Sequence, residues 1–414
     1  MARASTLVKI WLDDIGCMQS LLIGELRISD HTDAPASFSY HSTWLQHKDA
    51  YAIDPYLPLV SGPQYPVRGS LPGIFRDSAP DRWGRVLIER RESLHAIKEN
   101  RTSKTLFDID FLLAVQDASR MGGLRFQDDQ GNFIASAEFA VPPISQLREL
   151  QALATRIQEV GIESLPEYEQ WLAMLMAPGS SLGGARPKAN FQDVDGSLWI
   201  AKFPAQEDRY DIGKWEYLAH RLANKAGIHV PNAIVEQLGS QYHTFCVQRF
   251  DRVNHCRRMY ASAMTMTGKQ DGESGSYLDI AQVITEHGAR GFIEADLAQL
   301  FKRLLFNVAI GNRDDHLRNH GFLRADSGWR LAPAFDMNPN PAKREHALHL
   351  GIATTPENAL EVVVSTYQFY RLSEQQAATI LDEVLSAVQT WQEEARRLKI
   401  AEIEIRRMQS VFKI

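Results

Sequence analysis

The chain has 414 residues, of which 44% are hydrophobic and 23% charged, as in a globular protein long enough for two or three domains. Its 45 basic and 51 acidic residues leave a net charge of −6, which excludes a global electrostatic attraction to DNA or to anionic membranes. Three cysteines without a C-x-x-C pair exclude a disulfide framework, and no apolar run reaches the roughly 18 residues that a membrane span needs.

Short apolar runs near the N-terminus, at residues 6–11 and 21–26, are typical of strands. The flanking residues, among them Lys9 and Asp13, do not resemble those of a signal peptide. Together with the few cysteines, this predicts a protein of the reducing cytoplasm with no membrane association.

A helix is predicted to begin at Arg82 and to continue to Arg101, with its basic side chains in solvent. The Val141-Pro142-Pro143 break that follows indicates a domain boundary near residue 140. Beyond it, apolar residues at helical spacing predict a helix over residues 147–157.

The next segment alternates strands with one helix, predicted at residues 188–193, 197–203, 212–226 and 243–250. Val194-Asp195-Gly196 has the composition of a hairpin turn between the first two strands. Gly227 stands where a helix C-cap belongs, so the helix is predicted to end there.

Beyond residue 290 the pattern is mostly helical. An apolar stripe from Leu297 predicts a helix that ends at Gly311, and Ser373 with Gln376 predicts a capping box at the start of another long helix. Between them, Asp326-Ser327-Gly328 predicts the turn of a hairpin. A strand-rich half before a helical half predicts a two-lobed, kinase-like α+β body.

The run from Gly311 to Asn319 carries the strongest functional signal. Asp314 and Asn319 have the D-x-x-x-x-N spacing of a protein-kinase catalytic loop, and Asp336 adds a carboxylate after the predicted hairpin. In phosphoryl transfer, one aspartate orients the attacking hydroxyl and accepts its proton, while an asparagine and a second aspartate hold Mg²⁺. We therefore predict Asp314 as the catalytic base, in preference to Asp315, with Asn319 and Asp336 as metal ligands. The alternative is a capped helix end with solvated acids.

Other residues are predicted to bind the nucleotide. Lys202 shares a strand face with aliphatic residues, so its ammonium needs an anionic partner. Phosphates would supply one, with Glu216 as the carboxylate of a kinase-type Lys–Glu pair, unless the ammonium lies in water at the strand end. Near the next strand, the backbone at Gln248 and the Phe250 ring are candidates for adenine, and Asp251 for a ribose hydroxyl. Phe250 as core filling is the alternative.

The loop before the predicted hairpin contains Gly183 and Gly184, which would let backbone N–H groups approach phosphate oxygens closely. Arg186 or Lys188 could add positive charge there, although a surface turn is the alternative. His316, inside the acidic run, is either a contact to the nucleotide or phosphoryl group, or a buried histidine with a satisfied ring.

Taken in order, these segments resemble the HipA family of bacterial serine/threonine kinases, the toxins of type II toxin–antitoxin operons. The resemblance rests on residues 38–40, 44–45, 77–85, 122–126, 183–188, 249–252, 312–319 and 333–336. It implies an α+β, two-lobed protein-kinase-like fold with an added N-terminal β-rich subdomain and an all-helical C-lobe. The implied domains are residues 1–140, the N-lobe at 141–252 and the C-lobe at 253–414.

The resemblance also implies an ATP- and Mg²⁺-dependent serine/threonine protein kinase whose lysine, base and metal ligands are those predicted above. A phosphate-loop serine, Ser181 or its neighbour Ser180, would be autophosphorylated, which ejects the loop and silences the enzyme. The implied partners are a helix-turn-helix antitoxin similar to HipB, and operator DNA bound through that complex. The implied substrate is glutamyl-tRNA synthetase, another aminoacyl-tRNA synthetase or another translation component, whose modification would arrest growth, as in persistence.

Two other functions stay open. A small-molecule kinase of the aminoglycoside or choline type can share the acidic loop and the second aspartate. A kinase-like co-repressor scaffold would support an antitoxin on operator DNA without turnover. Such a scaffold has no need for a base, two metal ligands and a lysine together, which argues against it as the sole role.

Overall fold

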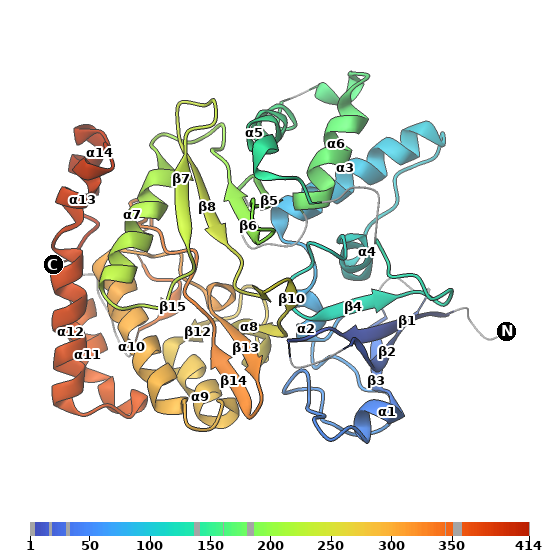
Figure 1. Ribbon diagram of the computed structural model, residues 1–414, viewed down its shortest axis with the longest axis horizontal. Coiled ribbons are helices and arrows are strands. Elements are labelled where there is room, and N and C mark those ends of the chain that lie inside the picture. Colours follow the sequence, from blue (N-terminus) through green and yellow to red (C-terminus); the bar gives the residue numbers. More distant parts are fainter. Residues whose placement is uncertain are drawn as a thin grey trace. The chain divides into compact units, whose positions relative to one another are not determined.

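The structure is a computed structural model that describes residues 5–15, 19–29, 34–135, 141–159, 161–179, 186–343, 345–350 and 358–413. The chain divides into two compact units, Met1–Gln206 with Asp251–Ala261 and Glu207–Phe250 with Ser262–Ile414. Figure 1 labels their elements. The three-part division at residues 140 and 252 stays a prediction. Within the described ranges, no helix is both long and apolar enough to cross a membrane.

The described part of the first unit contains sheet strands, helices and two short 3-10 helices. In chain order these are β1 (Ser5–Leu12), β2 (Leu21–Ser29), β3 (Ser37–Tyr40), α1 (Ser42–Leu45), α2 (Gly73–Asp77), α3 (Arg82–Lys98), α4 (Asp108–Ala114), β4 (Leu124–Gln127), η1 (Ile144–Gln146), α5 (Leu147–Arg156), η2 (Ile162–Ser164), α6 (Tyr168–Gly179), β5 (Lys188–Gln192), β6 (Leu198–Lys202), β9 (Arg252–Val253), β10 (Cys256–Arg257) and β11 (Tyr260–Ser262).

An antiparallel sheet in the order β3-β2-β1-β4 forms the N-terminal part of this unit. Alternate residues of β1, namely Val8, Ile10 and Leu12, are at most 1% exposed, as expected of a strand with one face on a core. The two strands and the helix that were predicted before residue 140 are confirmed by β1, β2 and α3.

The β5–β6 hairpin belongs to the same unit. Its turn closes at Gly196, whose φ of +81° lies in the left-handed region that glycine adopts without strain. The helices α5 and α6 pack against β5, and α6 also packs against α3. The predicted hairpin and the predicted helix after Pro143 are therefore confirmed.

The second unit is richer in helices. In chain order its described elements are α7 (Ile212–Lys225), β7 (Ala233–Glu236), β8 (Thr244–Gln248), α8 (Ala263–Met266), β12 (Gly275–Ser276), α9 (Tyr277–His287), α10 (Ile293–Ala309), η3 (Leu317–Asn319), β13 (Gly321–Ala325), β14 (Gly328–Leu331), β15 (Leu348–His349), α11 (Ala359–Ser365), η4 (Tyr367–Tyr370), α12 (Glu374–Val388), α13 (Trp391–Arg397) and α14 (Glu402–Met408).

Helix α10 forms the core of this unit, because it packs against α9, α11, α12 and β14 (Figure 1). Its apolar stripe, including Leu297, Leu300 and Leu304, is fully buried. Helix α12 opens with the predicted capping box, in which Ser373 Oγ accepts from the Gln376 N–H at 3.2 Å and Gln376 Oε1 accepts from the Ser373 N–H at 2.8 Å.

One expectation is corrected here. The C-terminal part is not all-helical, because β13 and β14 form an antiparallel hairpin and β12 pairs with β15 in parallel. The hairpin itself was predicted from its turn residues.

Candidate phosphoryl-transfer site

The acidic loop begins at the end of α10. Gly311 has a φ of +66° and its N–H donates to Val308 O at 3.1 Å, while the Asn312 N–H donates to Asn307 O at 2.8 Å. This is a Schellman motif, which ends a helix with two hydrogen bonds to its last carbonyls. The loop therefore leaves a rigid, buried helix at a defined residue, as its sequence predicts.

The two adjacent aspartates have opposite environments. The Asp314 side chain is 56% exposed and forms an ion pair with Lys343. The Asp315 side chain is only 6% exposed and lies in a buried polar cluster. One carboxylate of the run is thus available to solvent and ligands, and the other is committed to the interior.

Three side chains bind the Asp315 carboxylate. The Tyr277 hydroxyl donates to it, Asn307 Nδ2 lies 3.2 Å from Oδ2, and His320 Nε2 lies 3.0 Å from Oδ1. Burial alone would raise the pKa of Asp315, but the His320 ring and the Tyr277 hydroxyl hold this pKa below its ordinary value. The buried carboxylate is therefore ionised, and it organises donors from α9, from α10 and from the end of η3.

A turn at residues 340–343 packs against the acidic loop. The Asn340 N–H donates to Gly311 O at 3.0 Å, and Asn340 Oδ1 accepts from the Lys343 N–H at 3.2 Å. Arg313 Nη1 donates to Lys343 O at 2.6 Å. These bonds place the Lys343 ammonium beside Asp314. The sequence carries no signal for this lysine, because nothing in its neighbourhood marks it as a site residue.

Asn319 is the last residue of η3 and is 8% exposed. Its Nδ2 donates to Asp314 O at 3.3 Å, so the amide nitrogen is used by the main chain of the loop. The amide oxygen is then the end that remains for a ligand. The structure therefore brings Asn319 to Asp314, as the five-residue step predicts.

Asp336 follows the β13–β14 hairpin. The Ala332 N–H donates to Gly321 O at 2.8 Å, so the hairpin returns the chain to a point two residues after Asn319 and four residues before Asp336. Asp336 has a φ of +58°, a conformation that costs an L-residue of order 1–3 kcal/mol and that clusters at functional sites. How closely Asp336 approaches Asn319 stays a prediction.

The Phe250 ring contacts the segment that carries Asp336, since its centroid lies 5.4 Å from that of Phe335. Gln248, at the end of β8, accepts from Asn232 Nδ2 through its side chain and donates its N–H to Asn232 O. Both predicted adenine candidates are therefore held in the second unit. Phe250 is half-buried, so the structure is compatible with an adenine contact and with core filling alike.

Asp251, predicted to reach a ribose hydroxyl, has a buried carboxylate. Its carboxylate is 0% exposed and accepts from the Gly122 N–H at 2.8 Å and from Arg252 Nη1 at 2.6 Å. A buried carboxylate with these donors ties the 251–261 segment to the first unit. We therefore leave Asp251 out of the proposed nucleotide site.

His316 lies at the start of η3 and is half-buried. Its Nδ1 is buried without a hydrogen-bond partner among the described residues, so the predicted alternative of a satisfied buried ring is not what the structure contains. An orphaned ring nitrogen next to the two aspartates is compatible with a polar ligand at this point.

Lys202 ends β6 and is half-buried, and its direct cross-strand partner in β5 is Lys188. Lys188 is 2% exposed, and its Nζ lies 2.9 Å from Asp81 Oδ2. The buried pair makes Lys188 a structural residue rather than a phosphate ligand. Glu216, predicted to pair with Lys202, lies on α7 and is 4% exposed. That pairing stays a prediction.

The predicted phosphate-loop residues Ser180, Ser181, Gly183 and Gly184 lie outside the described residues. No group of three or more His, Cys, Asp or Glu side chains suited to a metal occurs within the described ranges. The predicted magnesium ligands are one amide, Asn319, and one carboxylate, Asp336, so they would not form a group of that kind.

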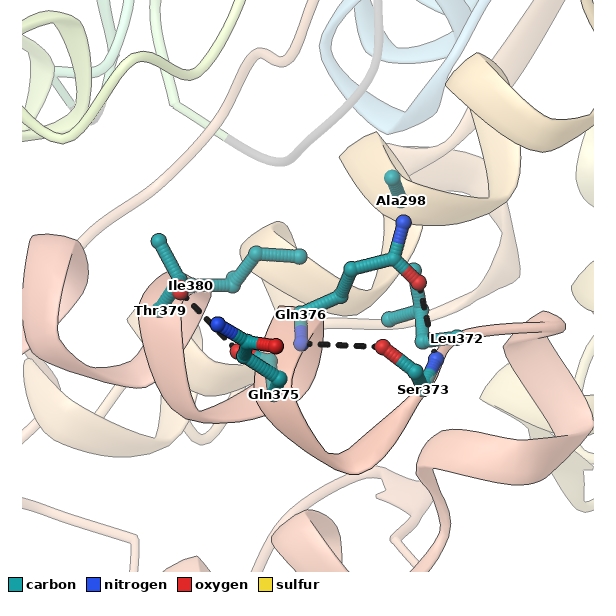
Figure 2. Close-up of a pocket in the computed structure, with 7 residues that line it drawn as sticks. All are labelled: Ala298, Leu372, Ser373, Gln375, Gln376, Thr379 and Ile380. Atoms are coloured by element: carbon teal, nitrogen blue, oxygen red, sulfur yellow. Dashed lines mark hydrogen bonds between the residues drawn. The ribbon is translucent and has the colours of Figure 1, made fainter.

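A pocket of about 340 Å³ lies elsewhere in the second unit, between α10 and the start of α12. Figure 2 shows its lining, which includes the capping box of α12. None of the predicted site residues lines it: its walls are Ala298, Leu372, Ser373, Gln375, Gln376, Thr379 and Ile380. The pocket is therefore separate from the acidic loop.

Comparison with known families decides the identity of the fold. A family model described as the HipA-like C-terminal domain matches residues 180–391, a little over half of the chain, and one described as the HipA N-terminal domain matches residues 16–109. The chain belongs to the HipA family. All the predicted site residues of this HipA-family chain lie within the first of these ranges.

Curated HipA-family relatives are distant. The serine/threonine-protein kinase toxin HipA of Shewanella oneidensis is 24% identical over 225 residues, which cover 48% of this chain and 51% of that protein. The chain thus spans about half the length of the curated relatives it matches.

Among solved structures, a chain of the Shewanella oneidensis MR-1 complex of HipA, HipB and operator DNA has a TM-score of 0.65 at 18% identity. The match covers 97% of this chain and 94% of that one. The predicted α+β, kinase-like HipA fold is therefore confirmed.

The sequence reasoning missed the residues that support the loop of this HipA-family chain. Tyr277, Asn307 and His320 were not predicted, although His320 follows Asp315 by the same five-residue step that links Asp314 to Asn319. That repeated step was a usable signal. Tyr277 carries none, because only the fold brings α9 to the loop, and Asn307 carries none, because its sequence position within α10 does not show that its side chain turns toward Asp315.

Proposed function

We propose that this chain is an ATP-dependent serine/threonine protein kinase in which Asp314 is the catalytic base. The observation that carries the proposal is the difference in exposure between the two adjacent aspartates of the loop. The Asp314 carboxylate is exposed, and the Asp314 carbonyl oxygen accepts a hydrogen bond from the Asn319 amide. The neighbouring Asp315 carboxylate is buried. A base must reach a substrate hydroxyl, and the exposure of the Asp314 carboxylate supports this role for it over the buried Asp315.

In the proposed reaction, the hydroxyl oxygen of a serine or threonine attacks the γ-phosphorus of ATP. The bond from that phosphorus to the bridging oxygen breaks, ADP leaves, and the hydroxyl proton passes to Asp314. Lys202 would contact the phosphates, and the Gln248 backbone and the Phe250 ring would contact adenine. His316, with its orphaned ring nitrogen, would bind the phosphoryl group or its surroundings.

Magnesium would be held by Asn319 and Asp336. Amide and carboxylate oxygens are the hard ligands that Mg²⁺ prefers, and when bound the ion neutralises charge on the phosphates. The observations that favour this fit are the orientation of the Asn319 amide, whose nitrogen is used by the loop, and the strained backbone of Asp336.

The biological setting is part of the proposal. The protein would act as a toxin on a translation component such as glutamyl-tRNA synthetase or another aminoacyl-tRNA synthetase. Autophosphorylation of Ser181 or Ser180 would silence it, and a helix-turn-helix antitoxin would neutralise it on operator DNA. Support comes from family membership and from the similarity of the fold to a protein solved with HipB and operator DNA.

The test uses purified full-length protein, γ-labelled ATP and a host lysate, with labelled proteins identified by mass spectrometry. Asp314→Asn should lower transfer to protein by roughly 10²- to 10⁴-fold, the range for loss of a general base. Asp326→Asn, in the exposed turn of the β13–β14 hairpin, is the matched control and should keep full activity. An Asp314→Asn variant with wild-type activity would refute the role. Label in a metabolite instead of protein would favour a small-molecule kinase.

A further inference from the structure

The acidic loop contains the same five-residue step twice. Asp315 follows Asp314 directly, and His320 follows Asn319 directly. Asn319 Nδ2 lies 3.3 Å from Asp314 O, and His320 Nε2 lies 3.0 and 3.1 Å from the two oxygens of Asp315. Each residue of the buried pair is thus the covalent neighbour of a residue of the proposed site.

The buried pair is also fixed to the body of the unit. The Tyr277 hydroxyl from α9 donates to the Asp315 carboxylate. Asn307 Nδ2 from α10 lies 2.8 Å from that hydroxyl and 3.2 Å from Asp315 Oδ2, and Asn312 Nδ2 donates to Asn307 Oδ1 at 3.2 Å. The loop is therefore anchored before Asp314, through α10, and after Asn319, through His320.

We propose that Asp315 and His320 are positioning residues for phosphoryl transfer. Their buried ionic hydrogen bond sets the separation between Asp314 and Asn319, and thereby the distance from the base to the metal ligand. This inference rests on the proposed function, because it assigns the loop geometry to that reaction. Misplacement of reacting groups by about 1 Å can cost about 100-fold in rate, so a strong bond at this point has a catalytic consequence.

A purely structural role is the competing explanation, and the same unit offers a matched control. The Asp296 side chain on α10 is 5% exposed, close to the 6% of Asp315, and its carboxylate also has three donors. Arg330 Nε lies 2.8 Å, Arg330 Nη2 3.0 Å and the Leu331 N–H 3.1 Å from its oxygens. Asp296→Asn and Asp315→Asn make the same chemical change in similarly buried carboxylates, but only the second is bonded next to the site.

The experiment compares these two variants with His320→Ala and His320→Gln in the full chain. Asp315→Asn and His320→Ala should lower kcat at saturating ATP by about 10- to 100-fold, as do losses of residues that orient metal ligands. They should also raise the Mg²⁺ concentration needed for half-maximal rate. His320→Gln keeps an N–H that can reach Asp315 and should restore most of the rate. Asp296→Asn should lower the melting temperature as much as Asp315→Asn does, with kcat near wild type.

Equal kcat values for Asp315→Asn and Asp296→Asn at equal melting temperatures would overturn the positioning role while leaving the kinase proposal intact. Absence of transfer by the wild-type protein would instead reject the kinase proposal.

Amide hydrogen exchange of the protein alone then tests the loop geometry by itself. Asp315→Asn should speed exchange at residues 314–319 at least 10-fold relative to Asp296→Asn. Equal exchange in the two variants would reject the role of the buried pair in fixing the loop.

Discussion

Replacing Gly311 by alanine should destabilise the second unit more than the same change at Gly227. Both glycines follow long helices in left-handed conformations, with φ of +66° and +74°. The helix end at Gly227 has the same two hydrogen bonds as the one at Gly311. The Gly227 N–H donates to Asn224 O, and the Ile228 N–H donates to Ala223 O. The two sites therefore impose the same backbone cost on alanine, and they differ in what surrounds the new methyl group.

The surroundings set the magnitude. A Cβ at position 311 would lie 2.6 Å from both Cγ1 and the carbonyl oxygen of Val411, and backbone cannot move aside easily. At position 227 the nearest atom is Lys302 Nζ at 3.1 Å, the far end of a flexible side chain. Left-handed strain costs roughly 1–2 kcal/mol at either site. Overpacking against Val411 adds about 1–3 kcal/mol, so Gly311→Ala should cost roughly 2–5 kcal/mol in total.

Thermal unfolding followed by circular dichroism measures the difference. For a unit of this size, 1 kcal/mol corresponds to about 2–4 °C, so Gly311→Ala should melt at least about 2 °C below Gly227→Ala. It should also lower phosphoryl transfer, because position 311 begins the loop that carries Asp314. Equal melting temperatures would refute the reasoning, since they would mean that the close contact to Val411 carries no energetic cost.

Two further predictions concern the first unit. Asp81→Asn should lower the free energy of unfolding, measured by urea titration, by about 3–5 kcal/mol, because it removes the carboxylate that pairs with the buried Lys188 ammonium. Adding Lys188→Met should recover most of this loss. A double variant no more stable than Asp81→Asn alone would contradict the prediction. Burial raises the pKa of Asp54 to about 6, despite N–H donors from Tyr56 and Ile74, so protonation stabilises the folded state as the pH falls below 6. Wild type should therefore gain about 2 kcal/mol relative to Asp54→Asn between pH 7.5 and 4.5, and a constant difference would show that Asp54 does not titrate in this window.

Local signals predicted much of this fold. The C-caps at Gly227 and Gly311, the capping box at Ser373 and the turn at Gly196 are each determined by a few neighbouring residues, and each is confirmed. Such boundaries can be predicted because only a few residue types adopt a left-handed backbone conformation or satisfy the unpaired N–H groups at the start of a helix. The exclusion of strands from the C-terminal part was wrong because it ignored the hairpin whose turn had itself been predicted.

Long-range contacts could not be predicted in the same way. Asp251 follows a strand in the place expected of a ribose ligand, but its carboxylate binds the Gly122 N–H, 129 positions earlier in the chain. Lys188 looked like a phosphate contact, but it is buried against Asp81, 107 positions away. In both cases the local sequence correctly predicts a charged side chain, but it does not show which distant residue that side chain binds. The partner decides whether that charge is available to a ligand.

The sequence alone does not show which of Asp314 and Asp315 is exposed. The two residues are chemically identical and adjacent, and spacing alone favours the first as the base. The structure adds a reason for this choice. The pairs 314–319 and 315–320 share one step, so a slip of one residue would place Asp314 opposite Asn307 and Tyr277 and would put the amide of Asn319 where the imidazole of His320 now lies. A neutral amide would then replace the imidazole that holds the pKa of the buried carboxyl below its ordinary value, so the ionised carboxylate would be less well stabilised in the interior. The donors of the interior, and not the acidic run itself, therefore select which aspartate is buried and which is exposed to solvent.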